Sequence, residues 1–167
     1  MKFSAALTFL AAPLAVMAVP AASPSPSPSP SFSPSPSPSS KVDAAAAGTV
    51  DVKYDPAYDN PDLDLNTVSC SDGPNGLVTK GYKTAGSLPS FPRVGAAFSV
   101  SWNSPNCGKC YQLTYNGKSI YVTAIDQATT GFNIAQEALD ELTGGQAVQL
   151  GHVQATYAEA APANCGF

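Results

Sequence analysis

The stretch W-N-S-P-N-C-G-K-C-Y-Q-L-T-Y-N-G-K-S-I-Y-V-T-A-I-D, residues 102–126, decides the fold of this chain. Apolar and polar residues alternate over 111–115 and again over 120–124, with Asn116-Gly117 between the two runs. Asn-Gly in that position is the strongest short-range signal for a β-hairpin, because both turn positions favour positive φ. The stretch also holds the single Trp, two of the four cysteines and, at the end of an apolar strand, Asp126.

The composition narrows the possible partners. Only 12% of the 167 residues are charged, the net charge is −4 and the sequence pI is about 4.6. An acidic domain repels phosphate backbones and anionic lipid surfaces, so we expect neither nucleic-acid nor membrane binding. Four Asp residues cluster over 55–64, but their spacing does not match a calcium-binding loop. The sequence therefore predicts no metal or other cofactor, and leaves neutral or weakly basic ligands open.

The first 48 residues have the sequence features of a secreted protein's N-terminal region and not those of a folded domain. Residues 1–18 have the features of a secretory signal peptide, with Lys2, an apolar run and a small-residue cleavage site. The apolar run is shorter than the roughly 20 residues of a membrane span. Residues 19–48 form a Ser/Pro-rich linker that we expect to be disordered and extended. We therefore predict a secreted, extracellular or cell-wall protein whose folded domain is 49–167.

The domain is expected to be mainly β. Besides the hairpin, short strands are indicated at 50–54, 66–70, 98–102, 146–150 and 152–157. One helix is expected, because Asn133 is a good N-cap with Gln136 three residues on, and Gly144 can end the helix in the left-handed conformation. About seven short strands and a single convincing helix predict a small closed barrel.

The cysteines can be interpreted in two ways. Cys107 and Cys110 form a C-x-x-C pair, which alone suggests a redox dithiol or half of a zinc site. However, Cys70 and Cys165 lie singly, and the pair precedes a strand rather than opening a helix. In an oxidising compartment, two structural disulfides are favoured. Four cysteines allow three connectivities, of which 70–107 with 110–165 would tie both halves of the domain to the hairpin.

Asp126 is the sharpest candidate for chemistry. A carboxylate at a strand end, beside aromatic residues, is suited to act as a general acid. The alternative is an Asp that accepts hydrogen bonds from the next loop or from the helix start near Asn133. A glycosidase normally needs a second carboxylate about 5 to 9.5 Å away. Asp55 is the best candidate for that second acid, and it stands in a loop that is equally well explained as solvated.

The aromatic residues suggest a ligand. Sugar rings stack on aromatic faces, and their hydroxyls bind short polar side chains, so a groove of Tyr, Asn, Asp and Thr suits a neutral glycan. The alternative is that the aromatics form the core, which we expect for Trp102 and at least half of the Tyr residues.

Several short segments of the domain form a recognisable set: Val52-Lys53-Tyr54-Asp55, Val68-Ser69-Cys70-Ser71-Asp72-Gly73, residues 102–110, Ile120-Tyr121-Val122, Ala124-Ile125-Asp126, Gly131-Phe132-Asn133-Ile134, Leu142-Thr143-Gly144-Gly145 and Asn164-Cys165. With these segments, residues 49–167 resemble the cerato-platanin family. The signal peptide fits the family, whereas the Ser/Pro tract departs from its compact form. The resemblance implies a six-stranded double-psi β-barrel with one or two short helices, similar to the first domain of expansins. It also implies the disulfides Cys70–Cys107 and Cys110–Cys165.

The resemblance implies a function as well. It points to a secreted, non-hydrolytic protein that binds chitin oligomers or another cell-wall polysaccharide, with expansin-like wall loosening and elicitation of plant defence. Asp126 matches the barrel aspartate retained in expansins and related glycosidases, whereas their second acid is not evident. The expected glycan-binding residues are Tyr54, Asp55, Asp72, Asp126 and Asn133. The alternatives are a weak glycoside hydrolase using Asp126 and Asp55, and a surface-active structural protein. A host receptor is a possible partner, and we expect a monomer that can self-assemble at surfaces.

Overall fold

The computed structural model describes residues 48–167 of the chain. The expected signal peptide and nearly all of the Ser/Pro linker lie outside these described residues. No helix in the described part is long and apolar enough to cross a bilayer.

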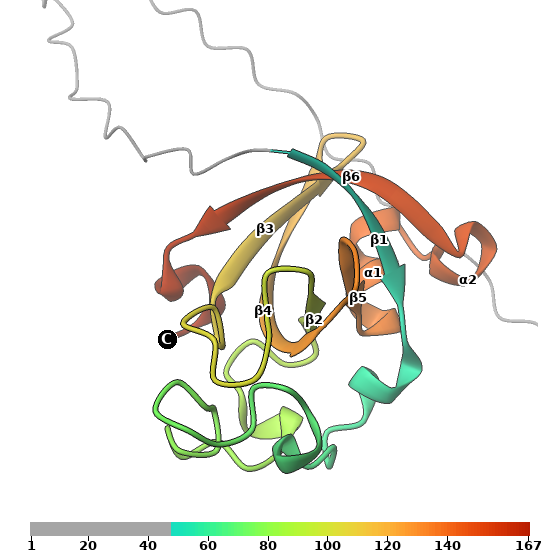
Figure 1. Ribbon diagram of the computed structural model, residues 1–167. Coiled ribbons are helices and arrows are strands. Elements are labelled where there is room, and N and C mark those ends of the chain that lie inside the picture. The colour runs from blue at the N-terminus through green and yellow to red at the C-terminus, as the bar shows by residue number, and fades with distance from the viewer. Residues whose placement is uncertain (1–47) are drawn as a thin grey trace, which may run out of the picture. The chain divides into compact units, whose positions relative to one another are not determined.

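Six strands close into a barrel in the order β1-β5-β2-β4-β3-β6 (Figure 1). The strands are β1 (Gly48–Tyr54), β2 (Val94–Ala97), β3 (Cys110–Tyr115), β4 (Lys118–Gln127), β5 (Phe132–Ile134) and β6 (His152–Ala160). The β1–β5 and β2–β4 pairs are parallel, and the other neighbours are antiparallel. The mainly β class and the closed six-stranded barrel are therefore confirmed.

The hairpin predicted from residues 111–124 joins β3 to β4. Tyr115 pairs with Lys118, and the turn residues Asn116 and Gly117 have φ of 48° and 80°. Alternate side chains of the hairpin, such as Leu113 and Val122, are 0% and 1% exposed. The period-2 pattern thus places one face of the hairpin in the barrel interior, where each buried aliphatic side chain contributes about 1.5–3 kcal/mol.

Helices cover one side of the barrel and fill its long connections. α1 (Gln136–Thr143) packs against β4, and α2 (Ala147–Leu150) follows it. The short 3-10 turns are η1 (Pro56–Asp59), η2 (Leu65–Thr67), η3 (Ala85–Ser87) and η4 (Pro162–Cys165). Three of them lie in the long connection between β1 and β2, drawn in green in Figure 1.

Three predicted strands are wrong. Residues 66–70 run from η2 into a turn, because the Asp64 carboxylate accepts the backbone N–H of Asn66 and starts a 3-10 turn. Residues 98–102 are also a turn, and the strand in this region is β2, which ends at Ala97. Residues 146–150 are mostly the short helix α2, whose Val148 is 63% exposed. In each case a short alternating run had no neighbouring strand to pair with.

The helix start was also predicted wrongly. Asn133 lies in β5 and does not cap α1. Both oxygens of the Asp59 carboxylate instead accept the backbone N–H groups of Gln136 and Glu137, each at 2.9 Å. An acidic group at a helix N-terminus satisfies unpaired donors and complements the helix dipole. The C-terminal signal is confirmed, since Gly144 takes φ 74° and ψ 39°.

Both expected disulfides are present. Cys70 is bonded to Cys107, and Cys110 to Cys165. The first bond ties the β1–β2 connection to the loop before β3, and the second ties β3 to the C-terminal turn. Closing loops of 37 and 55 residues stabilises the fold by roughly 4 kcal/mol each in the chain-entropy model.

Candidate functional site

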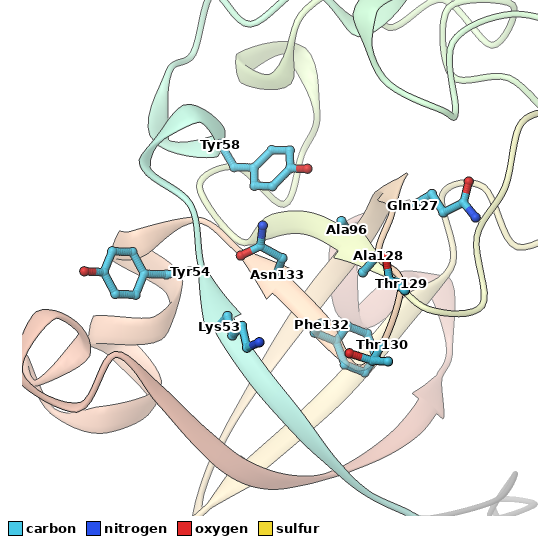
Figure 2. Close-up of a pocket in the computed structure, with 10 residues that line it drawn as sticks. All are labelled: Lys53, Tyr54, Tyr58, Ala96, Gln127, Ala128, Thr129, Thr130, Phe132 and Asn133. Carbon is cyan, nitrogen blue, oxygen red and sulfur yellow. The ribbon is translucent and has the colours of Figure 1, made fainter.

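A cleft of about 480 Å³ opens beside the ends of β1, β2 and β5 (Figure 2). Its lining is mostly neutral and polar, with aromatic rings among the polar groups. The lining residues are Lys53, Tyr54, Tyr58, Ala96, Gln127, Ala128, Thr129, Thr130, Phe132 and Asn133. Lys53 is the only ordinarily charged side chain in this lining, so the cleft suits an uncharged ligand with many hydroxyl or amide groups.

Strand pairing explains why Asn133 lies at the centre of the cleft. Asn133 is on the short strand β5, opposite Lys53 of β1 and Ala96 of β2. Figure 2 shows the Asn133 amide between Tyr54 and the small Ala96, below the Tyr58 ring. An Asn amide offers two N–H donors and a carbonyl acceptor, so it can bind an amide or a hydroxyl of a ligand.

The end of β4 and the loop after it form the second wall. Gln127, Ala128, Thr129 and Thr130 follow Asp126 directly and contribute an amide and two hydroxyls to the lining. Figure 2 shows this wall across the cleft from Tyr54, whose hydroxyl points away from Asn133. The cleft is therefore bounded by a tyrosine at one end and short polar side chains at the other.

Asp126 does not line the cleft, but it binds two residues that do, Tyr58 and Gln127. Its Oδ1 accepts the backbone N–H of Ser69 at 2.9 Å and that of Gln127 at 2.8 Å, and its Oδ2 accepts the Tyr58 hydroxyl at 3.0 Å. The carboxylate thus joins the end of β4, η1 and the segment before Cys70. Asp126 was expected to be either a general acid or an acceptor of structural hydrogen bonds, and this geometry fits the acceptor. Its donors, however, are not at the start of α1.

Tyr58 completes the arrangement, and in the sequence only its aromatic side chain pointed to a role. Its side chain is 8% exposed, and it lines the cleft while donating to Asp126. Burial, followed by the nearby Asp126 carboxylate, raises the pKa of Tyr58 well above its ordinary value of about 10. The phenol is therefore a neutral donor at physiological pH.

The other acidic candidates lie outside the cleft lining. Asp55 caps η1, with its Oδ1 accepting the backbone N–H of Ala57 at 2.9 Å. Asp72 is on an exposed loop, where its Oδ1 accepts the Trp102 indole N–H at 2.8 Å. That hydrogen bond lowers the pKa of Asp72 below its usual range. The cleft therefore brings together Tyr54 and Asn133, Asp126 is linked to it through Tyr58, and a ligand-binding role for any of the five stays a prediction.

Two further expectations concern residues around the site. Trp102 was predicted to be in the core and is 62% exposed, so that prediction is wrong. Among the described residues 48–167, no group of three or more His, Cys, Asp and Glu side chains could hold a metal ion.

The sequence analysis missed the lining residues Gln127, Thr129 and Thr130. A strand end and the loop after it do not reveal which edge of the barrel they will border.

Comparisons with known proteins identify the family. The family model described as Cerato-platanin matches residues 50–167. Allergen Asp f 15 of Aspergillus fumigatus is 59% identical over 124 residues, covering 74% of this chain and 81% of that protein. The crystal structure of cerato-platanin 3 from M. perniciosa has a TM-score of 0.69 and 49% identity, covering 72% of this chain and 100% of that one. The solution structure of the fungal elicitor cerato-platanin has a TM-score of 0.63 and 37% identity, with 70% and 96% covered.

Proposed function

The chain belongs to the cerato-platanin family, and we propose that it is a secreted, non-hydrolytic protein that binds neutral cell-wall glycans, chitin oligomers in particular, and acts as an elicitor with expansin-like activity on walls. The observation that carries this proposal is the open cleft of about 480 Å³ with Asn133 at its centre and mostly uncharged polar and aromatic side chains around it.

The chemistry of the lining fits N-acetylglucosamine units. Each unit carries hydroxyls and one amide, which match the Asn133 and Gln127 amides and the Thr129 and Thr130 hydroxyls. The Tyr54 ring gives apolar surface for one face of the sugar. A cleft lined chiefly by uncharged hydrogen-bonding groups favours such a ligand over an acidic or strongly basic one.

The position of Asp126 supports binding without hydrolysis. A glycosidase acid must donate a proton to the glycosidic oxygen, and a second carboxylate must act across the scissile bond. Asp126 accepts three hydrogen bonds from its surroundings, and no carboxylate is among the cleft-lining residues. Asp55, the partner in the hydrolase alternative, is held as the cap of η1. The binding function is therefore the better supported of the two.

Secretion and elicitation rest on different supports. Two disulfides suit an oxidising, extracellular compartment. The elicitor role is inferred from the 37% identity to the fungal elicitor cerato-platanin. A host receptor, self-assembly at surfaces and the monomeric state stay predictions.

Calorimetry with chitin oligomers of increasing length tests the proposal. Asn133→Ala should lower the affinity about tenfold, because it removes a central amide worth roughly 1.4 kcal/mol of hydrogen bonding. Gln149→Ala, an exposed residue of α2 outside the cleft lining, is the matched control and should bind normally. Equal affinity for both variants would contradict the proposal. Reducing ends released by the wild type but not by Asp126→Asn would favour the hydrolase.

A further inference from the structure

Trp102 is the only Trp in the chain and is 62% exposed. An exposed apolar residue is by itself common on protein surfaces. Trp102 differs because its indole N–H donates to Asp72 Oδ1 at 2.8 Å. A charge-assisted hydrogen bond at one ring edge holds the ring in place while much of its surface stays in water.

The two loops that carry this pair are held together. The Asn103 side-chain oxygen accepts the backbone N–H of Asn75 at 3.0 Å, and the Asn75 side-chain amide donates to the Asn103 carbonyl at 2.9 Å. Asn103 itself has φ 54°, a conformation that its neighbours must maintain. The Cys70–Cys107 disulfide bridges the same two loops. The indole and the Asp72 carboxylate are therefore presented by a cross-linked support, which lowers the entropic cost of binding.

The pair lies close to the cleft network. Ser69 donates its backbone N–H to Asp126, and Asp72 is three residues further along the chain. Three residues span at most about 10 Å even when fully extended. A glycan of several units is therefore long enough to span from the edge of the cleft to Trp102.

The ring and the carboxylate together match one kind of ligand. A pyranose ring has an apolar face that stacks on an indole and equatorial hydroxyls at its edge that donate to an acceptor. The Trp102 and Ser71 hydrogen bonds both fall on Asp72 Oδ1, so within residues 48–167 Oδ2 is left to accept a hydroxyl. A wholly apolar partner that covered the indole would displace water from this exposed carboxylate oxygen without offering a donor in its place.

We propose that Trp102 and Asp72 form a second sugar-binding subsite, in which one neutral pyranose unit stacks on the indole while Asp72 accepts its hydroxyl. The subsite extends the cleft, so this inference rests on the proposed glycan-binding function. The affinity of the protein should therefore rise with oligomer length, because short oligomers occupy the cleft alone and longer ones contact both sites.

The single Trp makes the test direct. The disulfide-intact protein is titrated with N-acetylglucosamine oligomers of two to six units, with Trp emission and calorimetry recorded on the same samples. The wild type should show a blue-shifted, saturable emission change with the longer oligomers. Trp102→Ala should weaken binding of the hexamer about three- to tenfold and leave the disaccharide unaffected, whereas Trp102→Phe should retain most of the affinity. Because the side chain is exposed, both variants should melt like the wild type.

Each other outcome overturns the subsite. Trp emission could stay unchanged at a hexamer concentration that saturates the calorimetric signal, or Trp102→Ala could keep the wild-type affinity. Either result would mean that the indole does not contact the bound glycan. Equal losses for disaccharide and hexamer would remove the length dependence. Loss of self-association rather than of sugar binding in Trp102→Ala would make the indole a protein contact. Asn133→Ala distinguishes the two proposals. If the cleft binds no sugar and only the Trp102–Asp72 subsite does, this variant should bind the hexamer with wild-type affinity.

Discussion

Replacing Tyr58 with Phe should destabilise the protein by removing one hydroxyl from the network behind the cleft. The ring stays buried, so the change deletes chiefly the hydrogen bond from Tyr58 to Asp126 Oδ2 at 3.0 Å. Hydrogen bonds to charged groups contribute about 1.5–3 kcal/mol. Asp126 is half-buried and keeps its two backbone donors, so we take the lower end, about 1.5 kcal/mol. For a domain of this size that corresponds to a melting temperature lower by roughly 6 °C.

The same variant has a predicted pH dependence. In the folded protein, burial and the Asp126 carboxylate raise the pKa of Tyr58 above the value of about 10 expected in the unfolded chain. The folded state therefore holds this proton at pH values where the unfolded state has lost it. The contribution of Tyr58 to the free energy of unfolding is complete below about pH 10 and falls as the pH rises above it. The difference from Tyr58→Phe should shrink over that range.

Thermal unfolding followed by circular dichroism at pH 7, 9 and 11 tests both statements. Tyr121→Phe is the matched control, because it removes a hydroxyl from the same strand as Asp126 without touching the Tyr58 contact. Melting temperatures of Tyr58→Phe and wild type within 1 °C at pH 7 would refute the reasoning about the network. A difference that grows above pH 10 would refute the pKa argument.

Asp126→Ala should lower the free energy of unfolding by about 3 kcal/mol, since the Ser69 and Tyr58 donors lose their acceptor; denaturant unfolding measures this, and a loss below 1 kcal/mol would contradict it. Gly131→Ala should cost several kcal/mol, because Gly131 has φ 57° and an added Cβ would collide with the Asp51 carbonyl oxygen. Gly117→Ala, with φ 80° and open space around it, should cost only about 1–2 kcal/mol, and similar losses for the two would sink this argument. Trp102→Phe should raise the pKa of Asp72 towards its usual range by removing the indole donor; a carboxyl NMR titration that finds no rise would oppose the Trp102–Asp72 hydrogen bond.

Local signals in the sequence predicted the elements whose partners are also local. The β3–β4 hairpin was correct because alternation and the Asn116-Gly117 turn specify both strands and their register. The left-handed end of α1 at Gly144 was correct for a similar reason. The resemblance to a known family supplied the six-stranded barrel and the disulfide pairing, which no local pattern contains.

The errors concern residues whose roles depend on distant partners. The cap of α1 is Asp59, 77 residues before Gln136, so no sequence window around the helix reveals it. β5 has only three residues, and its parallel pairing with β1 has no local signal. The alternation around Trp102 resembles a strand, but no neighbouring strand pairs with it and the indole remains exposed. Of the cleft lining, the sequence analysis expected Tyr54 and Asn133, whereas the positions of Tyr58 and residues 127–130 follow from the fold.

The central claim is that the cleft around Asn133 binds a neutral glycan. The most direct test is an NMR titration of the isotope-labelled, disulfide-intact protein with chitin oligomers of increasing length. Saturable shifts should cluster at Tyr54, Gln127, Thr129 and Asn133, with Trp102 joining only for the longer oligomers. The absence of shifts at these residues at millimolar sugar, or saturable shifts confined to another face of the barrel, would contradict the claim.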